Sequence, residues 1–243
     1  MTRPLDRHAA VLFDLDGVLT PTAEVHRRAW KRTFDRAIAA HVGPDADPFT
    51  LDDYFTYVDG KPRYDGVHSF LVSRGIVLPT GRPADPPSLE SETGIGNLKN
   101  DEFLTVLQEE GVVPYPGSVT LLDHLQDKGV AVAVVSSSAN AVAVLEAAGL
   151  RDRFDIVVDG VVARQRGLPG KPAPDTFLAA TADLDCSPVD AVVVEDAISG
   201  VEAAVAGGFS LVVGVDREEQ AAALWQAGAH VVVTDLADLV AEA

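Results

Sequence analysis

The stretch AAVLFDLDGVLT, residues 9–20, decides how this chain folds. Its apolar first half is typical of a buried strand, and Asp14 and Asp16 follow directly at the carboxyl end of that strand. Open parallel sheets bind ligands at this edge, and Gly17 lets the backbone turn away sharply. Two carboxylates so close repel each other, so one needs a cation or a proton nearby. The pair suits a metal-assisted nucleophile beside a general acid/base, but an Asp-x-Asp after a strand is as typical of a plain turn.

Length and charge limit the classes of protein to consider. The 243 residues allow one large domain or a core with a smaller domain, and 47% hydrophobic residues permit a substantial core. With 37 acidic and 19 basic residues, the net charge is −18. Nucleic acids and anionic membranes attract positive charge, so we expect neither as a partner. A phosphorylated small molecule is compatible, because a local cluster with a metal can overcome the overall field.

The N-terminal segment and the single cysteine bear on the compartment. Cys186 cannot form a disulfide within the chain, which fits a reducing environment. Residues 1–8 have no long apolar stretch after their basic residues, so we expect no signal peptide. No run approaches the roughly 18 apolar residues of a membrane span. These features predict a soluble cytoplasmic protein, which we expect to be a monomer.

The C-terminal half alternates between strand and helix patterns. Valine-rich runs predict strands at 130–135, 155–158, 191–194, 211–215 and 231–233. Helix patterns lie between them at 139–148, 174–182, 197–206 and 218–226. Such alternation is typical of an α/β protein whose parallel sheet is covered by helices on both faces.

Residues 22–113 follow a different pattern, with no strong strand. Helices are expected at 23–40, 51–58, 64–74 and 97–110. Residues 75–96 contain four prolines and four glycines, which indicates a long loop. We therefore predict an α/β catalytic core, residues 1–20 and 115–243, and a helical cap domain, residues 21–114, inserted after the first strand.

Three later segments add polar groups to the Asp14 pair. Ser136-Ser137-Ser138-Ala139-Asn140 follows one strand, Lys171 precedes a helix, and Glu195-Asp196 ends another strand. Taken singly, the serines could cap a helix and Lys171 could be a surface lysine. Because carboxyl ends of parallel strands share one edge, we expect these groups to meet there. Carboxylates would hold a hard cation such as Mg²⁺, while the lysine and a hydroxyl would bind phosphoryl oxygens.

With these four segments in order, nearly the whole chain resembles the haloacid dehalogenase superfamily of phosphoryl-transfer enzymes. Within it, the chain is most similar to the β-phosphoglucomutase-like branch, because residues 14–20, Thr22, His26 and Trp30 follow the opening of that branch. Lys171 to Asp175 and Glu195-Asp196 match as well. The resemblance implies a Rossmannoid parallel-sheet core carrying a helical cap.

The resemblance also implies the role of each core residue. Asp14 would be the nucleophile that becomes an aspartyl phosphate, and Asp16 would be the general acid/base. Mg²⁺ would be held by Asp14, the Asp16 carbonyl and Asp196, with Glu195 nearby. The transferring phosphoryl group would be bound by Ser136 and Lys171.

Further residues would bind the sugar phosphate. By resemblance they are Thr22, His26, Trp30, Gly60, Arg63, Lys99, Ser138 and Asn140. His26, Trp30 and Phe34 recur every four residues and so share one helix stripe. The planar fork of Arg63 suits a second phosphate, which a mutase must hold and a simple phosphatase need not.

Three functions stay open at this point. The leading one is a β-phosphoglucomutase-type isomerase of β-glucose 1-phosphate and glucose 6-phosphate. A sugar-phosphate phosphatase is the second, because Ala139 stands where the family often has a lysine and the loop at 75–96 is long. A non-catalytic phosphosugar-binding module is the third. Exclusion of water by a closing cap would separate the first two.

Overall fold

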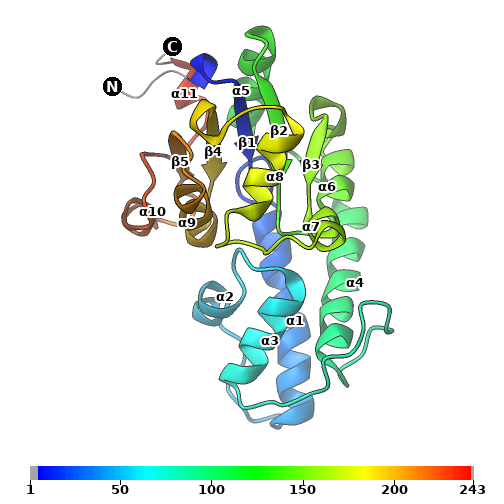
Figure 1. Cartoon of the computed structure of the whole chain (residues 1–243). Helices are drawn as coiled ribbons and strands as arrows, with labels where there is room; N and C mark the ends of the chain where they lie inside the picture. Colours follow the sequence, from blue (N-terminus) through cyan, green and yellow to red (C-terminus); the bar gives the residue numbers. More distant parts are fainter. Residues whose placement is uncertain (1–4, 242–243) are drawn as a thin grey trace. The chain divides into compact units, whose positions relative to one another are not determined.

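The computed structural model describes residues 5–241 and divides into two compact units, each considered separately below (Figure 1). Unit 1 comprises Met1–Pro21 and Val112–Ala243, and unit 2 comprises Thr22–Gly111. Unit 2 thus begins one residue later and ends three residues earlier than the cap expected at 21–114. Among the described residues, no helix is both long and apolar enough to cross a bilayer.

Unit 1 is built on a six-stranded sheet in the order β3-β2-β1-β4-β5-β6. The strands are β1 Ala10–Phe13, β2 Ala131–Val135, β3 Ile156–Val158, β4 Ala191–Glu195, β5 Leu211–Val215 and β6 Val231–Val233. Every neighbouring pair is parallel, and β1 lies between β2 and β4. All residues of β1, β4 and β5 are buried, as their unbroken apolar runs predict for strands covered on both faces. The predicted α/β fold is confirmed.

Helices cover this sheet. They are η1 Leu5–Arg7, α5 Pro116–Asp127, α6 Ala141–Ala147, η2 Arg151–Arg153, α7 Gly160–Arg166, α8 Asp175–Asp183, η3 Pro188–Asp190, α9 Ile198–Ala206, α10 Ala221–Ala227 and α11 Asp238–Ala241. The helices α8, α9 and α10 lie side by side over the strands from β3 to β6 (Figure 1). Buried Phe177 of α8 and Val201 of α9 pack there with Leu12 and Val193 of the sheet. This packing holds in place the strands whose carboxyl ends carry the polar side chains described below.

In unit 1, one helix begins later than the sequence predicts, and another helix was not predicted. The helix expected at 218–226 begins only at Ala221, because residues 216–220 form a turn in which Glu219 has a φ of 57°. Helix α7 was not predicted, although Asp159 caps it by accepting hydrogen bonds from the amides of Val161 and Val162. A seven-residue helix with little apolar periodicity gives a weak sequence signal.

Unit 2 consists of α1 Thr22–His41, α2 Leu51–Tyr57, α3 Arg63–Ser73 and α4 Glu92–Glu110. Its core is a cluster of aromatic rings around the fully buried Phe34. The centroid of that ring lies 4.9 Å from Trp30, 5.0 Å from Phe49 and 4.2 Å from Phe70. Aromatic pairs at such distances add stabilisation to the burial of their area, so this cluster holds the helices together.

The long loop of unit 2 is shorter than the predicted 75–96. Helix α4 begins at Glu92, because the Ser91 hydroxyl accepts a hydrogen bond from the Gly94 amide at 3.0 Å and caps the helix. The helix expected at 97–110 was therefore five residues too short. Asn97 donates from Nδ2 to the carbonyls of Pro83 and Asp85, so the loop is anchored to α4.

Candidate active site

Asp14 stands where β1 ends at the carboxyl edge of the unit 1 sheet. Its amide donates to the Val194 carbonyl at 2.9 Å, which continues the pairing of β1 with β4 by one residue. The side chain is buried, at 7% relative exposure for the residue. Asp16 is half-buried in the following turn, which is closed by the Gly17 amide donating to the Thr20 carbonyl at 2.8 Å. The strand thus fixes Asp14, and the turn fixes Asp16.

Gly17 brings the turn into contact with a second acidic loop. Its φ of +85° favours glycine. A Cβ atom at this position would lie 1.9 Å from Oδ2 of Asp196, so any side chain would overlap that carboxylate. The glycine is needed both for the turn and for the close approach of the loop that carries Asp196.

Lys171 joins three strand ends through one ammonium group. Its Nζ donates to Oδ1 of Asp14 at 2.6 Å and to Oε2 of Glu195 at 2.7 Å. A third bond reaches the Val135 carbonyl at 3.1 Å, at the end of β2. Lys171 is only 4% exposed, so these three hydrogen bonds replace the water that its three donors have lost. Their geometry places Lys171 among the ends of β1, β2 and β4.

Three carboxylates gather beside this lysine. Ligand oxygens of Asp14, Glu195 and Asp196 all lie within 4.8 Å of one another. Glu195 ends β4, and a Cβ atom on Gly200 would lie 2.1 Å from its carboxylate carbon. Hard carboxylate oxygens grouped at this spacing are the donor set that Mg²⁺ prefers. The residues present therefore fit a magnesium ion.

The charges of the cluster shift its pKa values. Burial raises the pKa of Asp14 against the attraction of the Lys171 ammonium, and repulsion by Asp16 raises it further. Burial and the neighbouring Asp14 carboxylate raise the pKa of Glu195 to about 8. Burial opposes the charge on Lys171, but the two carboxylates outweigh it and raise the pKa of the ammonium. One ammonium faces several carboxylates, so a further cation would favour the ionised forms of Asp14 and Glu195.

The serine segment forms a turn directly after β2. Buried Ser136 accepts a hydrogen bond from the Ser138 amide at 3.0 Å, and the Ser138 hydroxyl accepts one from the Asn140 amide at 3.2 Å. Asn140 is the N-cap of α6 but makes no side-chain capping bond. The serines thus organise the turn itself, and Ser136 follows the residue whose carbonyl binds Lys171.

In unit 2, Lys99 is buried among ring systems. Its Nζ lies 2.6 Å from Nδ1 of His26, and 5.0 and 4.9 Å from the ring centroids of Trp30 and Phe103. The residue is 3% exposed. At this distance a hydrogen bond joins the two side chains, and the role of each nitrogen depends on the imidazole tautomer. The predicted residues His26, Trp30 and Lys99 therefore form one group, in which Trp30 also stacks in the aromatic core.

The remaining predicted residues of unit 2 lie on other elements. Arg63 is the first residue of α3, and its Nη2 donates to Oδ1 of Asn100 at 2.7 Å. Thr22 is the buried first residue of α1. Gly60 is half-buried between α2 and α3.

Sequence reasoning missed several residues that touch these groups. Gly200 makes room for Glu195, and a glycine inside an otherwise apolar helix pattern could have indicated such a close approach. Arg217 and Gln220 donate to the carbonyls of Gly17 and Asp196. No motif marks those two side chains, because their acceptors are backbone groups distant in sequence.

Comparisons with known proteins agree with this geometry. A model of the haloacid dehalogenase-like hydrolase family matches residues 8–208. The chain is 49% identical over 239 residues to "Beta-phosphoglucomutase" of Mycobacterium bovis, covering 95% of this chain and 91% of that protein. It is 30% identical over 207 residues to "Fructose-1-phosphate phosphatase YqaB" of Escherichia coli, covering 85% of this chain and 96% of that one. Among solved structures, a β-phosphoglucomutase from Clostridium difficile matches with a TM-score of 0.75 at 25% identity, covering 96% and 93% of the two chains.

Proposed function

The chain belongs to the haloacid dehalogenase-like hydrolase family, and from this premise we propose that it interconverts β-glucose 1-phosphate and glucose 6-phosphate by phosphoryl transfer through Asp14. The observation that carries the proposal is the buried network in which Lys171 binds both Asp14 and Glu195 beside Asp196. The choice of sugar phosphate follows the relative that is 49% identical and named β-phosphoglucomutase.

In the first half-reaction, a carboxylate oxygen of Asp14 attacks phosphorus and the bond from phosphorus to the sugar oxygen breaks. Asp16 gives its proton to the departing sugar oxygen. In the second half-reaction, Asp16 takes the proton of the attacking hydroxyl, whose oxygen displaces Asp14 from phosphorus. Splitting one transfer into two steps of this kind is covalent catalysis. Burial and Asp16 raise the pKa of Asp14, and the ammonium of Lys171 opposes that shift and favours the ionised form that attacks phosphorus.

Lys171 and Ser136 would hold the transferring phosphoryl oxygens, since positioning and charge stabilisation account for most of the catalysis of phosphoryl transfer. Asp14, the Asp16 carbonyl and Asp196 would hold Mg²⁺, with Glu195 nearby. When bound, the ion would supply positive charge that offsets the charge of the phosphoryl group.

A mutase must also bind the phosphate that is not being transferred. We assign this second phosphate to the guanidinium of Arg63, which Asn100 orients through a 2.7 Å hydrogen bond. Ser138 and Asn140 are assigned to the sugar phosphate, as the family resemblance implies. The other residues assigned to the sugar phosphate are Thr22, His26, Trp30, Gly60 and Lys99. The proposal includes a monomeric protein in the cytoplasm, where its one free cysteine, Cys186, stays reduced.

The test supplies β-glucose 1-phosphate, a trace of β-glucose 1,6-bisphosphate and Mg²⁺, and follows glucose 6-phosphate and inorganic phosphate in the same sample. We expect glucose 6-phosphate to form with little phosphate release. Asp14→Asn should abolish turnover, whereas Asp127→Asn, which changes an exposed aspartate of α5, should leave it unchanged. Turnover by Asp14→Asn would refute the covalent mechanism, and phosphate release without isomerisation would refute the mutase.

A sugar-phosphate phosphatase is the second candidate function. It is favoured by the similarity to a protein named fructose-1-phosphate phosphatase and by Ala139 in the turn after β2. Water would then replace the sugar hydroxyl in the second half-reaction. Phosphate release from a panel of hexose and pentose phosphates measures it, and a panel without any release would exclude this function.

A further inference from the structure

The loop between β5 and α10 lies against the acidic edge of unit 1 and contributes two side chains to it. Arg217 donates from Nε to the Gly17 carbonyl at 2.9 Å and from Nη1 to the Thr234 carbonyl at 2.7 Å. Its guanidinium carbon lies 3.9 Å from the centroid of the Tyr115 ring. Tyr115 in turn donates its amide to the Leu19 carbonyl at 3.0 Å. One arginine therefore contacts the Asp16 turn and a segment that supports the same turn.

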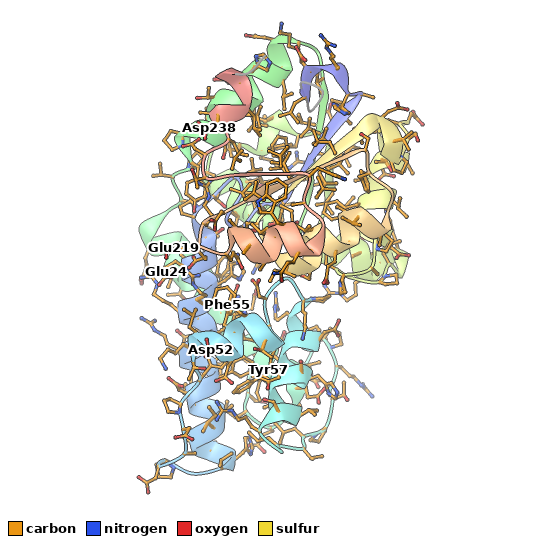
Figure 2. The ribbon with its side chains drawn as sticks, turned by 90° about the vertical axis from the view of Figure 1, so that its left-hand side faces the viewer. Glu24, Asp52, Phe55, Tyr57, Glu219 and Asp238 are labelled. Carbon is orange, nitrogen blue, oxygen red and sulfur yellow. The ribbon has the colours of Figure 1, made fainter. Side chains whose placement is uncertain are left out.

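Gln220, at the other end of this loop, contacts the second acidic segment. Its Nε2 donates to the Asp196 carbonyl at 3.2 Å, and its amide donates to Oδ1 of Asp216 at 2.8 Å. Asp216 is tied to β6 through its own amide, which donates to the Val233 carbonyl at 2.8 Å. Glu219, labelled in Figure 2, turns the loop with a left-handed φ of 57°. These bonds hold Gln220 on a fixed backbone.

The two carbonyls belong to the two loops that carry the acids. Gly17 directly follows Asp16, and the second carbonyl is that of Asp196 itself. The loops touch, since a Cβ atom on Gly17 would lie 1.9 Å from the Asp196 carboxylate. Like charges on both loops repel each other, so loops held only at their strands would move apart. A donor anchored on a third loop opposes that separation.

We propose that Arg217 and Gln220 are positioning residues that hold the Asp16 turn against the Asp196 loop and so set the affinity of the site for a divalent cation. The inference rests on the proposed function, because it assumes that the carboxylates bind Mg²⁺. Arg217 acts through its planar fork, which donates to two carbonyls from separate nitrogens and stacks on Tyr115, whereas a lysine ammonium is a single point donor without a planar face to stack on the ring. Partners that orient metal ligands typically change metal affinity by about 10- to 100-fold when they are removed.

The test titrates Mn²⁺, as a spectroscopic substitute for Mg²⁺, into metal-free protein and follows the electron paramagnetic resonance signal of the free ion. We expect the Kd of Arg217→Ala to rise by about tenfold or more and that of Gln220→Ala, which loses one bond, by about threefold. Arg217→Lys should restore part of the affinity. Arg166→Ala removes an arginine of the same unit whose partner is Asp183, and it should bind Mn²⁺ like the wild type. Thermal melting shows which variants are folded.

A second readout separates positioning from a general loss of structure. For folded Arg217→Ala, raising the Mg²⁺ concentration should recover most of the turnover rate that is lost at low Mg²⁺, because the KM for Mg²⁺ has risen. Equal Mn²⁺ affinity in the wild type and in both alanine variants would overturn the inference while leaving the proposed function intact. A wild type that binds no Mn²⁺ and turns over no sugar phosphate would overturn the proposed function, and this inference with it.

Discussion

Unit 1 buries Lys171 and unit 2 buries Lys99, yet the surroundings of the two ammonium groups differ in kind. Lys171, 4% exposed, lies between the carboxylates of Asp14 and Glu195. Lys99, 3% exposed, lies on aromatic ring faces and 2.6 Å from the imidazole of His26. In unit 1, the ammonium of Lys171 compensates the charges of two carboxylates, and removing the lysine leaves those carboxylates buried without it. In unit 2, the faces of aromatic rings and an imidazole contact the ammonium group. The two units should therefore respond differently when the lysine is replaced.

The largest effect is expected from Lys171→Met in unit 1. Removing the ammonium leaves two buried carboxylates side by side, and breaking a buried pair in this way costs about 3–5 kcal/mol of unfolding free energy. Urea unfolding at pH 8 in EDTA measures the loss. The control is Lys128→Met, whose lysine has a half-exposed side chain 4.0 Å from Asp6 and should change stability by no more than about 0.5 kcal/mol. Similar losses in both variants would mean that the network does not stabilise the unit.

The pKa of Glu195 gives the next prediction, which concerns the pH dependence of stability. Its pKa is raised to about 8 from 4.5, so the folded state binds more protons than the unfolded state between these values. Stability must then fall as pH rises from 5 to 8, by roughly 2–4 kcal/mol in metal-free protein. Glu195→Gln removes the titrating group and should flatten the curve, and Mg²⁺ should stabilise the wild type by binding its ionised form. An unchanged slope in Glu195→Gln would place the titration elsewhere.

A smaller effect is expected from Lys99→Met in unit 2. Methionine fills similar space and keeps contact with the rings, so the loss includes the cation–π contacts and the hydrogen bond to His26, which contribute about 1–2 kcal/mol. The control is Lys31→Met on α1, whose side chain is 53% exposed beside Asp35. Urea unfolding at pH 7 compares the two variants. A loss for Lys99→Met as large as that for Lys171→Met would remove the contrast between the units.

This contrast also explains what the sequence could predict. In unit 1, parallel strands bring their carboxyl ends to one edge, so a motif that follows a strand is placed by topology alone. Asp14, Val135 and Glu195 meet at Lys171 for that reason. The loop at 216–220 could not be predicted, because its side chains bind backbone carbonyls that any sequence would offer.

In unit 2, topology gives much less information. Helix patterns predicted the four helices, but which side chains meet depends on how the helices pack. The pairing of Lys99 with His26 spans 73 positions, and that of Arg63 with Asn100 spans 37. Family resemblance pointed to Lys99, His26 and Arg63 as single residues without indicating these partners. The extra turn of α4 depended on the cap at Ser91, which lies inside a segment rich in proline and glycine.

The smallest effect concerns a carboxylate of unit 2 whose pKa moves opposite to that of Glu195. Burial alone would raise the pKa of Asp53, but hydrogen bonds from Thr50 and from Arg74, at 2.7 Å, outweigh it and lower the pKa. A lowered pKa adds stability at neutral pH, and this is lost as pH falls below about 4 through the folded pKa. Solvent screening limits the contribution to about 0.5–1 kcal/mol.

Asp53→Asn should therefore be less stable than the wild type at pH 7, and the difference should shrink at pH 3. Asp52, labelled in Figure 2, is the exposed neighbour on α2, and Asp52→Asn is the matched control. Urea unfolding of both variants at the two pH values gives the comparison. A difference for Asp53→Asn that persists at pH 3 would mean that the capping geometry, rather than the charge, stabilises α2. The contribution of Glu195 to the unfolding free energy should fall as pH rises, whereas that of Asp53 should rise. Such opposite slopes would show that an ionised carboxylate destabilises the protein when it is buried at the sheet edge and stabilises it when it caps a helix.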